Sequence, residues 1–143
     1  MPASNLLCLD VGSVRVGVAL ATHGLKVARP VETLQRAAPD FWGHLSQLVQ
    51  TNQIDTIIMG LPRSLDGQDT PQTEATRQFR QEVSSKFPDV QIEMQDEALT
   101  SEKAKAILEQ RGGAFDKSEV DAVAASIILD DYLVEQETIH ERI

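Results

Sequence analysis

Apolar residues along the chain fall into short continuous runs that are bounded by turn-forming residues. Runs of this length are typical of buried strands. They predict five strands, at residues 5–10, 15–21, 27–34, 54–59 and 90–94. Pro30 lies inside the third run and indicates an edge or bulge position, because proline cannot donate to a strand ladder. Gly60 is expected to end the fourth strand.

Two other stretches show apolar positions that recur with the spacing of amphipathic helices, and two more polar stretches have the end signals of helices. They predict helices at residues 40–52, 70–86, 100–110 and 116–135. Thr70 and Pro71 form a suitable N-cap and first turn for the second helix. Asp116 is expected to cap the last helix, and a glycine pair at residues 112–113 to end the third.

The predicted order is three strands, a helix, a strand, a helix, a strand and two helices. Strands joined by short turns pair antiparallel, whereas strands joined through a helix run parallel. The chain therefore predicts an α/β fold with a mixed five-stranded sheet, three antiparallel strands plus two parallel ones, flanked by helices. We expect residues 1–136 to form a single domain and residues 137–143 to form a polar C-terminal tail.

Composition agrees with this single domain. The 143 residues include 41% hydrophobic and 24% charged side chains, which is ordinary for a folded protein. The sequence contains no signal peptide pattern and no apolar run long enough to cross a membrane. Its one cysteine, Cys8, excludes an internal disulfide and suits a reducing compartment, so we expect a cytoplasmic protein without a membrane partner.

The net charge of −9 is unusual for a protein that binds nucleic acid, since such proteins are generally basic. The distribution of the charge changes this picture. Residues 1–88 carry equal numbers of acidic and basic side chains, and the whole acidic excess lies in residues 89–143. Most of this excess is expected to be solvated surface, but bound cations would offset part of it.

Two acidic residues occupy positions where an apolar side chain is expected. Asp10 directly follows the apolar run Leu6–Leu9, where an uncompensated carboxylate is unfavourable. The alternative is a turn acid that caps the bend at Gly12. Asp121 shares its helix face with the apolar residues that follow it by 3, 4, 7 and 8 positions, so it is expected to point toward the sheet. Favourable interaction with the helix dipole would explain an acid near this end, but not its place on the buried face.

A third acid, Glu97, follows the fifth predicted strand. Asp96 and Glu97 compete there for one inward position, and an exposed acidic loop is the alternative. If the ends of the first and fifth strands meet the start of the last helix, then Asp10, Glu97 and Asp121 form a carboxylate cluster. Carboxylates without nearby His or Cys suit hard cations such as Mg²⁺ or Mn²⁺. Two such ions about 4 Å apart would support in-line attack on a phosphodiester.

Five short motifs are distributed in order over essentially the whole chain. They are residues 9–19 (LDVGSVRVGVA), 29–30 (RP), 60–67 (GLPRSLDG), 96–100 (DEALT) and 120–125 (VDAVAA). Together they resemble the YqgF/RuvX family, whose members are similar in fold to RNase H and to the RuvC Holliday junction resolvase. The resemblance implies that Asp10, Glu97 and Asp121 are the catalytic metal ligands.

The same resemblance bears on the basic residues. It implies that Arg15 contacts a phosphate of the substrate. Arg63 lies in a turn-rich loop that either contacts the substrate backbone or is a plain connector. The family usually has Arg after the motif Glu, whereas this chain has Ala98, a departure that affects substrate affinity and rate more than metal binding.

Two other groups of residues have alternative interpretations. Arg77 and Arg80, on the helix after this loop, either extend a basic track or lie on a solvated face. Phe41 and Trp42 either stack on a nucleic-acid base or, as we favour, anchor the start of their helix to the core.

Members of the family were first described as candidate Holliday junction resolvases and are now associated with nuclease maturation of the 5′ end of 16S rRNA. We therefore expect an endonuclease that uses two Mg²⁺ or Mn²⁺ ions and acts on structured RNA, as a monomer or a homodimer. The nearest alternative is a Holliday junction resolvase that acts on branched, four-way DNA. A non-catalytic RNA-binding or regulatory protein is a third hypothesis. The hairpin after Asp10 also resembles the first phosphate loop of actin-like ATPases, but the chain lacks room for their second lobe.

Overall fold

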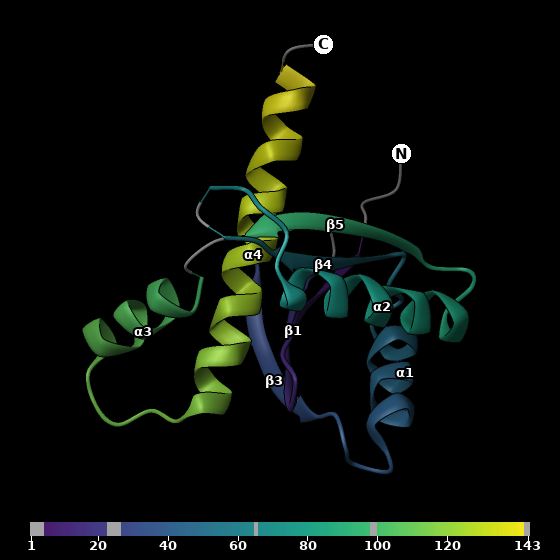
Figure 1. Cartoon of the computed structure of the whole chain (residues 1–143), viewed down its shortest axis with the longest axis horizontal. Coiled ribbons are helices and arrows are strands. Elements are labelled where there is room, and N and C mark those ends of the chain that lie inside the picture. Colours follow the sequence, from purple (N-terminus) through teal and green to yellow (C-terminus); the bar gives the residue numbers. More distant parts are fainter. Residues whose placement is uncertain (1–4, 23–26, 65, 98–99, 142–143) are drawn as a thin grey trace.

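The computed structural model describes residues 5–22, 27–64, 66–97 and 100–141, and the elements within these ranges follow the predicted order. The strands are β1 (Leu6–Val11), β2 (Arg15–Ala21), β3 (Arg29–Gln35), β4 (Thr56–Pro62) and β5 (Gln91–Glu97). The helices are α1 (Phe41–Thr51), α2 (Pro71–Lys86), α3 (Thr100–Arg111) and α4 (Lys117–Glu141). Figure 1 shows the sheet between α1 and α2 on one side and α4 on the other.

The five strands form one mixed sheet in the order β3-β2-β1-β4-β5. The first three pair antiparallel, and β4 and β5 extend the sheet from β1 in parallel. The predicted mixed sheet is therefore confirmed. Pro30 lies on the edge strand β3, and the β2–β3 register shifts between Val18 and Ala19, opposite Pro30. The proline thus occupies both an edge and an irregularity, as its missing N–H requires.

Alternation along β1 separates the two faces of the sheet, because successive side chains of a strand point to opposite sides. Leu7 and Leu9 belong to the core that is shared with α1 and α2. Leu6 and Cys8 belong to a second core, which is shared with α4. Asp10 continues the Leu6–Cys8 series and therefore lies on the α4 face.

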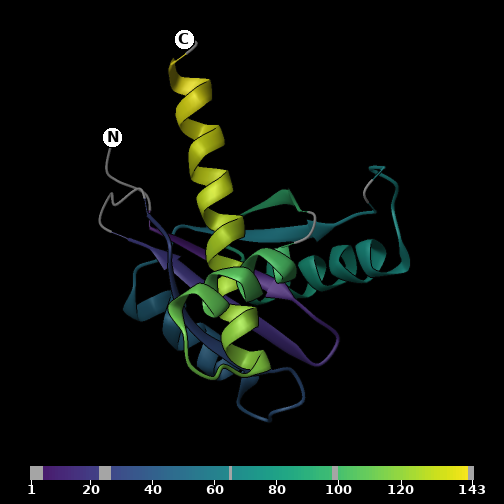
Figure 2. The same ribbon diagram turned by 90° about the vertical axis from the view of Figure 1, so that its left-hand side faces the viewer.

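The helix α3 packs against α4 rather than against the sheet. Ala104 and Leu108 of α3 form a small core with Val120 and Ala124 of α4. Figure 2 shows these two helices together in front of the sheet, with the C-terminal part of α4 projecting beyond it. In the part of the chain that the structure describes, no helix combines the length and apolar character that a membrane span requires.

The predicted helix ends are confirmed at three places. Thr70 caps α2: its hydroxyl accepts from the Thr73 backbone N–H, and the Thr73 hydroxyl accepts from the Thr70 backbone N–H. The Asp116 carboxylate accepts from the Glu119 backbone N–H at 3.0 Å at the start of α4. Both glycines after α3 have a positive φ, which side chains disfavour and glycine adopts freely.

Three predicted boundaries are wrong. The strand β4 does not end at Gly60 but continues to Pro62, because its parallel pairing with β5 continues there. The strand β5 likewise runs past Met94 to Glu97, although its last residues are polar. The helix α4 continues beyond the predicted end at residue 135, to Glu141. In β5 and α4 the additional residues are polar and resemble a loop or tail, whereas in β4 the turn-forming residues Gly60 and Pro62 suggest an earlier end.

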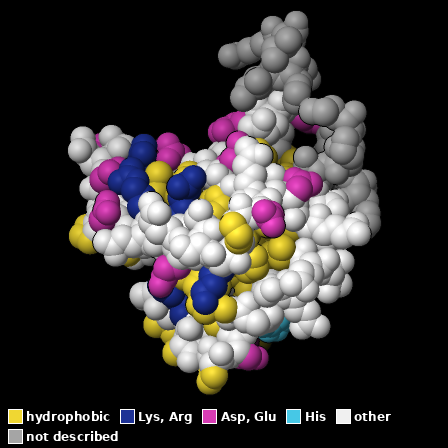
Figure 3. Space-filling model, turned by 90° about the vertical axis from the view of Figure 1, so that its right-hand side faces the viewer, with side chains coloured by type: hydrophobic (Ala, Val, Ile, Leu, Met, Phe, Trp, Pro, Cys, Tyr) yellow, Lys and Arg dark blue, Asp and Glu magenta, His cyan; other side chains and the backbone are white. Residues whose placement is uncertain are grey.

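The aromatic residues at the start of α1 pack on α2. Phe41 is buried, and the Trp42 ring stacks on the Phe79 ring with 5.6 Å between their centroids. The Arg36 guanidinium lies 4.7 Å from the Phe79 centroid, and the Lys86 ammonium lies 5.5 Å from that of Trp42. Figure 3 shows Lys and Arg side chains beside hydrophobic ones on this side of the molecule. The arrangement agrees with the interpretation that these rings anchor the helix to the core.

Candidate functional site

Asp10 lies near the end of β1, on the face that α4 covers. It pairs with Gly17 of the antiparallel neighbour β2. A Cβ atom at Gly17 would overlap the backbone oxygen of Asp121, so the α4 backbone lies directly against β2 at this point. Because directly opposed residues share a face of the sheet, the Asp10 side chain projects toward the start of α4.

Asp121 lies in the second turn of α4, on the side facing the sheet. The predicted inward face is confirmed, since Ala124, Ala125, Ile128 and Leu129 are all buried. Asp121 itself is partly buried, with 21% of its side-chain surface exposed. The absence of a side chain at Gly17 permits this close approach of helix and strand.

Glu97 is the last residue of β5, and strand alternation decides its competition with Asp96. Gln95 is buried and donates to Glu135 of α4, so Glu97, two residues further on, also faces α4. Asp96 points to the opposite side and is exposed. A Cβ atom at Gly60 would lie 3.3 Å from the Glu97 carboxyl carbon, which places this carboxyl group directly over Gly60.

The three acids interact electrostatically, although they are far apart in the sequence. The pKa of Asp10 is raised from 3.8 to about 7, mainly by burial and in addition by the Glu97 and Asp121 carboxylates. Burial also raises the pKa of the neighbouring Cys8 thiol, and Asp10 and Glu97 contribute to that shift. Burial and neighbouring acids both disfavour the charged form of Asp10, and a nearby positive charge would stabilise that form.

Arg15 supplies part of the missing positive charge. Its Nε donates to Asp121 Oδ2 at 2.6 Å, and both side chains are partly buried. This places Arg15 at the carboxylate group, as expected for a residue of the site. Its predicted contact with a substrate phosphate stays a prediction.

The donor chemistry of the three acids fits a hard divalent cation. All their ligand atoms are oxygens, and the increased pKa of Asp10 indicates a demand for positive charge. The side chains do not converge as a ready metal centre, however: among the described residues, no group of three His, Cys, Asp or Glu is placed to hold one ion. Asp121 is instead held by Arg15.

Gly17 and Gly60 shape the site, although the sequence pattern predicts a role in the site for neither of them. Gly17 admits the α4 backbone, and Gly60 admits the Glu97 carboxyl group together with the Ile128 side chain, whose Cδ1 would be 2.7 Å from a Cβ at Gly60. A signal was available, since glycine inside a strand often marks a close approach of another backbone or group.

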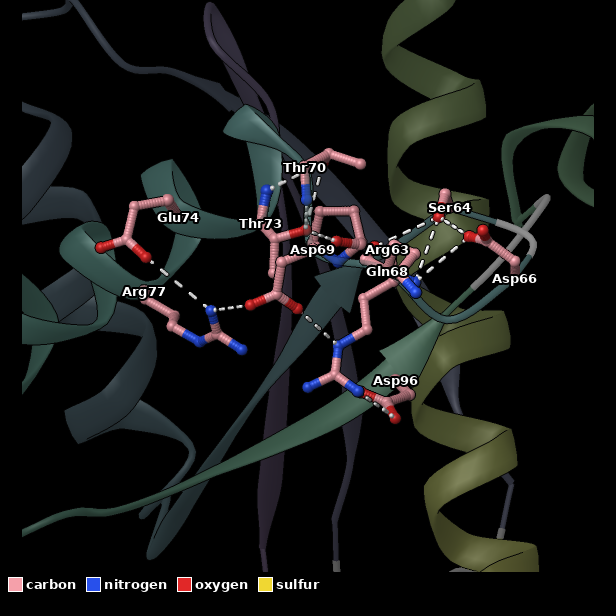
Figure 4. A network of polar contacts seen from close by, with 11 residues as sticks. Arg63, Ser64, Asp66, Gln68, Asp69, Thr70, Thr73, Glu74, Arg77 and Asp96 are labelled. Carbon is pink, nitrogen blue, oxygen red and sulfur yellow. Dashed lines mark hydrogen bonds and ion pairs between the residues drawn. The ribbon is translucent and has the colours of Figure 1, made fainter.

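Arg63 lies just past the end of β4, in a network of arginines and acids (Figure 4). Its Nε is 3.3 Å from Asp69 Oδ1, and its Nη1 is 3.4 Å from Asp96 Oδ2. The structure thus places Arg63 at the same edge of the sheet as Glu97, because Pro62, the residue before it, pairs with Glu97. Ala98, the departure from the family pattern, lies outside the described residues.

A pocket of about 440 Å³ lies elsewhere, between β3 and the α3–α4 pair. Its lining includes Val31, Leu108 and Ala122, with Arg111 and Glu119 at its polar part, and none of the three acids. The carboxylate site is instead formed at the sheet surface beside the start of α4.

Comparison with known sequences identifies close relatives over most of the chain. A sequence model of the family described as "RuvX: Holliday junction resolvase" matches residues 4–135. A protein of Chloroflexus aurantiacus, named as a candidate pre-16S rRNA nuclease, is 37% identical over 131 residues, which are 90% of this chain and 85% of that one. A protein of the same name from Escherichia coli is 34% identical over 134 residues, 91% of this chain and 96% of its own. The resemblance inferred from the motifs is confirmed.

Comparison with solved structures supports the fold. RuvC of Thermus thermophilus, in a complex with a Holliday junction substrate, matches with a TM-score of 0.54 and 11% sequence identity. The match covers 94% of this chain and 96% of RuvC. At this identity the likeness concerns the fold alone, and it confirms the predicted RNase H-like architecture.

Proposed function

The chain belongs to the RuvX family, and we propose that it is a metal-dependent endonuclease that matures the 5′ end of precursor 16S rRNA in the cytoplasm. The relatives named as candidate pre-16S rRNA nucleases cover nearly the whole chain, which supports the RNA substrate. The resemblance of the motifs around Asp10, Glu97 and Asp121 to those of the family supports hydrolysis of phosphodiester bonds as the reaction.

One observation carries the proposal. Asp10, Glu97 and Asp121 are far apart in the sequence and come from three different elements, yet their carboxylates lie on one face of the sheet. Burial, together with the Glu97 and Asp121 carboxylates, raises the pKa of Asp10 to about 7. A stable fold gains nothing from crowding three acids at a partly buried surface. Such crowding is typical of sites that bind cations during function.

We propose Asp10, Glu97 and Asp121 as the ligands of Mg²⁺ or Mn²⁺, most simply of two ions. When bound, the metal supplies an activated water as nucleophile and stabilises the leaving oxygen. The chain's own residues position the ligands: Gly60 gives the Glu97 carboxyl group its space, and Arg15 orients Asp121 through the 2.6 Å contact.

The direct test is cleavage of a precursor 16S rRNA leader by purified protein in Mg²⁺. Asp10→Asn should reduce the cleavage rate by about 10³-fold or more, because removal of a metal ligand removes the nucleophile and the charge compensation. Asp89→Asn makes the same change of charge in the exposed turn before β5, at the other end of that strand from Glu97, and should leave the rate unchanged. Undiminished cleavage by Asp10→Asn would show that this site is not the catalytic one and would favour a non-catalytic binding role.

A Holliday junction resolvase is the second candidate. The family description and the RuvC-like fold favour it. Cleavage of a four-way DNA junction and of the rRNA leader, compared at equal enzyme concentration, separates the two substrates. A four-way junction is two-fold symmetric, so a resolvase is expected to act as a homodimer, and a strict monomer in solution would contradict this candidate.

A further inference from the structure

Two arginines converge on one carboxylate at the edge of the sheet where β4 ends. Arg77 Nη1 of α2 donates to Asp69 Oδ2 at 2.6 Å, and Arg63 Nε lies 3.3 Å from Asp69 Oδ1. Figure 4 shows the Asp69 carboxyl group between the two guanidinium groups, one oxygen toward each. Asp69 is half exposed, with 50% of its side-chain surface accessible.

This cluster lies at the same end of the sheet as Glu97, but on the face that α2 covers, where Asp96 also points. Arg63 directly follows Pro62, the pairing partner of Glu97, so it leaves the sheet at the end where Glu97 lies. Asp69 directly precedes Thr70, the N-cap of α2. A helix N-terminus favours negative charge, which adds to the attraction of the two arginines for an anion.

The Asp69 carboxylate does not satisfy all the hydrogen-bond donors of the two arginines. The contacts of Arg63 with Asp69 and Asp96 are both long, and Arg63 Nε is buried without a hydrogen-bond partner among the described residues. A phosphodiester shares one negative charge between two non-bridging oxygens and has two further ester oxygens, and arginine binds phosphates through two parallel hydrogen bonds. A backbone phosphate would therefore satisfy more of these donors than the single carboxylate does.

We propose that Arg63 and Arg77 form a subsite for a phosphate of the nucleic-acid backbone, which Asp69 occupies in the free protein and leaves when substrate binds. The inference rests on the proposed function, because it needs a nucleic-acid substrate at the adjacent carboxylate site. The inference adds a second contact between protein and substrate, for which the Asp69 carboxylate competes with the substrate phosphate.

Asp69 is suited to act as the competitor at any physiological pH. Its hydrogen bond with Arg77 lowers the pKa of Asp69 below its usual value, so the carboxylate stays charged. Asp96 and Glu74 also contact these arginines, so the free cluster does not attract nucleic acid by excess positive charge. Departure of Asp69 is what makes the two guanidinium groups available.

The test measures binding rather than cleavage. Labelled precursor 16S rRNA leader and a labelled four-way DNA junction are titrated with the full chain by fluorescence anisotropy, in EDTA and at low salt. Asp69→Asn should lower the Kd roughly 2- to 5-fold, as expected for loss of partly exposed ion pairs. Arg77→Gln should raise the Kd. It should also reduce the slope of log Kd against log salt concentration by about 1, as expected for the loss of one phosphate contact.

A matched control lies in the same loop. Asp66→Asn makes the same change of charge, but the Asp66 carboxylate accepts from Ser64 and from the Gln68 backbone rather than from an arginine. It should not tighten binding, and the gain from Asp69→Asn should disappear in the Asp69→Asn/Arg77→Gln double variant.

Three results would contradict the proposed subsite. The first is that Asp66→Asn lowers the Kd as much as Asp69→Asn does, and the second is that Asp69→Asn still lowers the Kd when Arg77→Gln is also present. The third is that the wild-type chain binds nucleic acid and Asp69→Asn leaves the Kd unchanged. If the wild-type chain binds neither nucleic acid, the proposed function itself fails, and the subsite fails with it. The two failures are therefore distinguishable.

Discussion

At the end of β1, a carboxyl group takes a position that apolar side chains fill in the rest of the strand. Asp10 continues the Leu6–Cys8 series on the α4 face, and its pKa rises to about 7 through burial and the neighbouring acids. Its charged form is therefore disfavoured in the folded chain relative to the unfolded chain. The residue is better explained by a functional demand than by a contribution to stability.

This increased pKa predicts how stability depends on pH. The unfolded chain releases the Asp10 proton near pH 3.8 and the folded chain near pH 7, so the free energy of unfolding decreases as the pH rises through this window. Asp10→Asn should remove that loss and stabilise the chain at pH 8, by up to about 4 kcal/mol, with little effect below pH 4. Urea unfolding of both chains in EDTA at the two pH values measures the difference. Equal stability of the two chains at pH 8 would contradict the interpretation that the charged Asp10 carboxylate destabilises the folded chain.

Gly17 is a second residue whose substitution has a clear expected effect on stability. A Cβ there would overlap the Asp121 backbone oxygen, which cannot rotate away as a flexible side chain could. Gly17→Ala should therefore destabilise the chain by about 3 kcal/mol or more and displace Asp121 from the site.

Gly43 provides the matched control. It lies in α1 with nothing within 4 Å of a built Cβ, so Gly43→Ala should stabilise the chain by about 0.5–1 kcal/mol. Thermal or urea unfolding of the two variants decides the comparison, and a tolerated Gly17→Ala would mean that α4 can move away from β2.

At the scale of elements, the loop that carries Arg63 connects the strand β4 to the N-terminus of α2. The Thr73 hydroxyl donates to the Pro62 backbone oxygen at the end of β4, and Thr70 and Thr73 cap the helix reciprocally. These contacts hold the start of α2 beside the sheet edge where Glu97 lies.

Removal of the cap should therefore be measurable. Thr70→Ala is expected to destabilise the chain by about 1 kcal/mol, because a backbone N–H of α2 loses its acceptor. Thr70→Ser retains the hydroxyl and should restore most of that loss. Urea unfolding measures both variants, and identical stabilities for Ala and Ser would show that the hydroxyl contributes nothing.

The elements also show where sequence interpretation succeeded and where it did not. The apolar strands and the capped helices were predicted, since their signals are local periodicity and turn chemistry. The last three residues of β5 are polar and were interpreted as a loop. Their pairing with Gly60, Leu61 and Pro62 holds them in the sheet, and that pairing joins residues far apart in the chain.

At the scale of the whole molecule, the sheet is covered on one face by α1 and α2 and on the other by α4. The candidate site lies where β1, β5 and α4 approach one another. The contacts of α4 with the described core end at Tyr132 and Leu133, and the helix continues past the sheet (Figures 1 and 2).

A shortened chain tests the expected domain boundary. A chain that ends after Glu137 should fold with nearly unchanged stability, within about 1 kcal/mol, because surface segments contribute little. A chain that ends after Ala125 removes Ile128 and Leu129 from the core and should not fold. Far-UV circular dichroism and urea unfolding provide the measurement, and a large loss in the longer chain would place the boundary beyond residue 137.

The sequence alone determined the order of elements, the mixed sheet and the inward face of α4, including Asp121. These follow from periodicity and connection length, which are local properties of the chain. Only the tertiary structure decided between Asp96 and Glu97, brought Asp10 near Glu97 and Asp121, and gave Gly17 and Gly60 their roles in the site. Those features depend on strand register and on the distance between packed backbones, so they arise from residues that are neighbours in space and not in sequence.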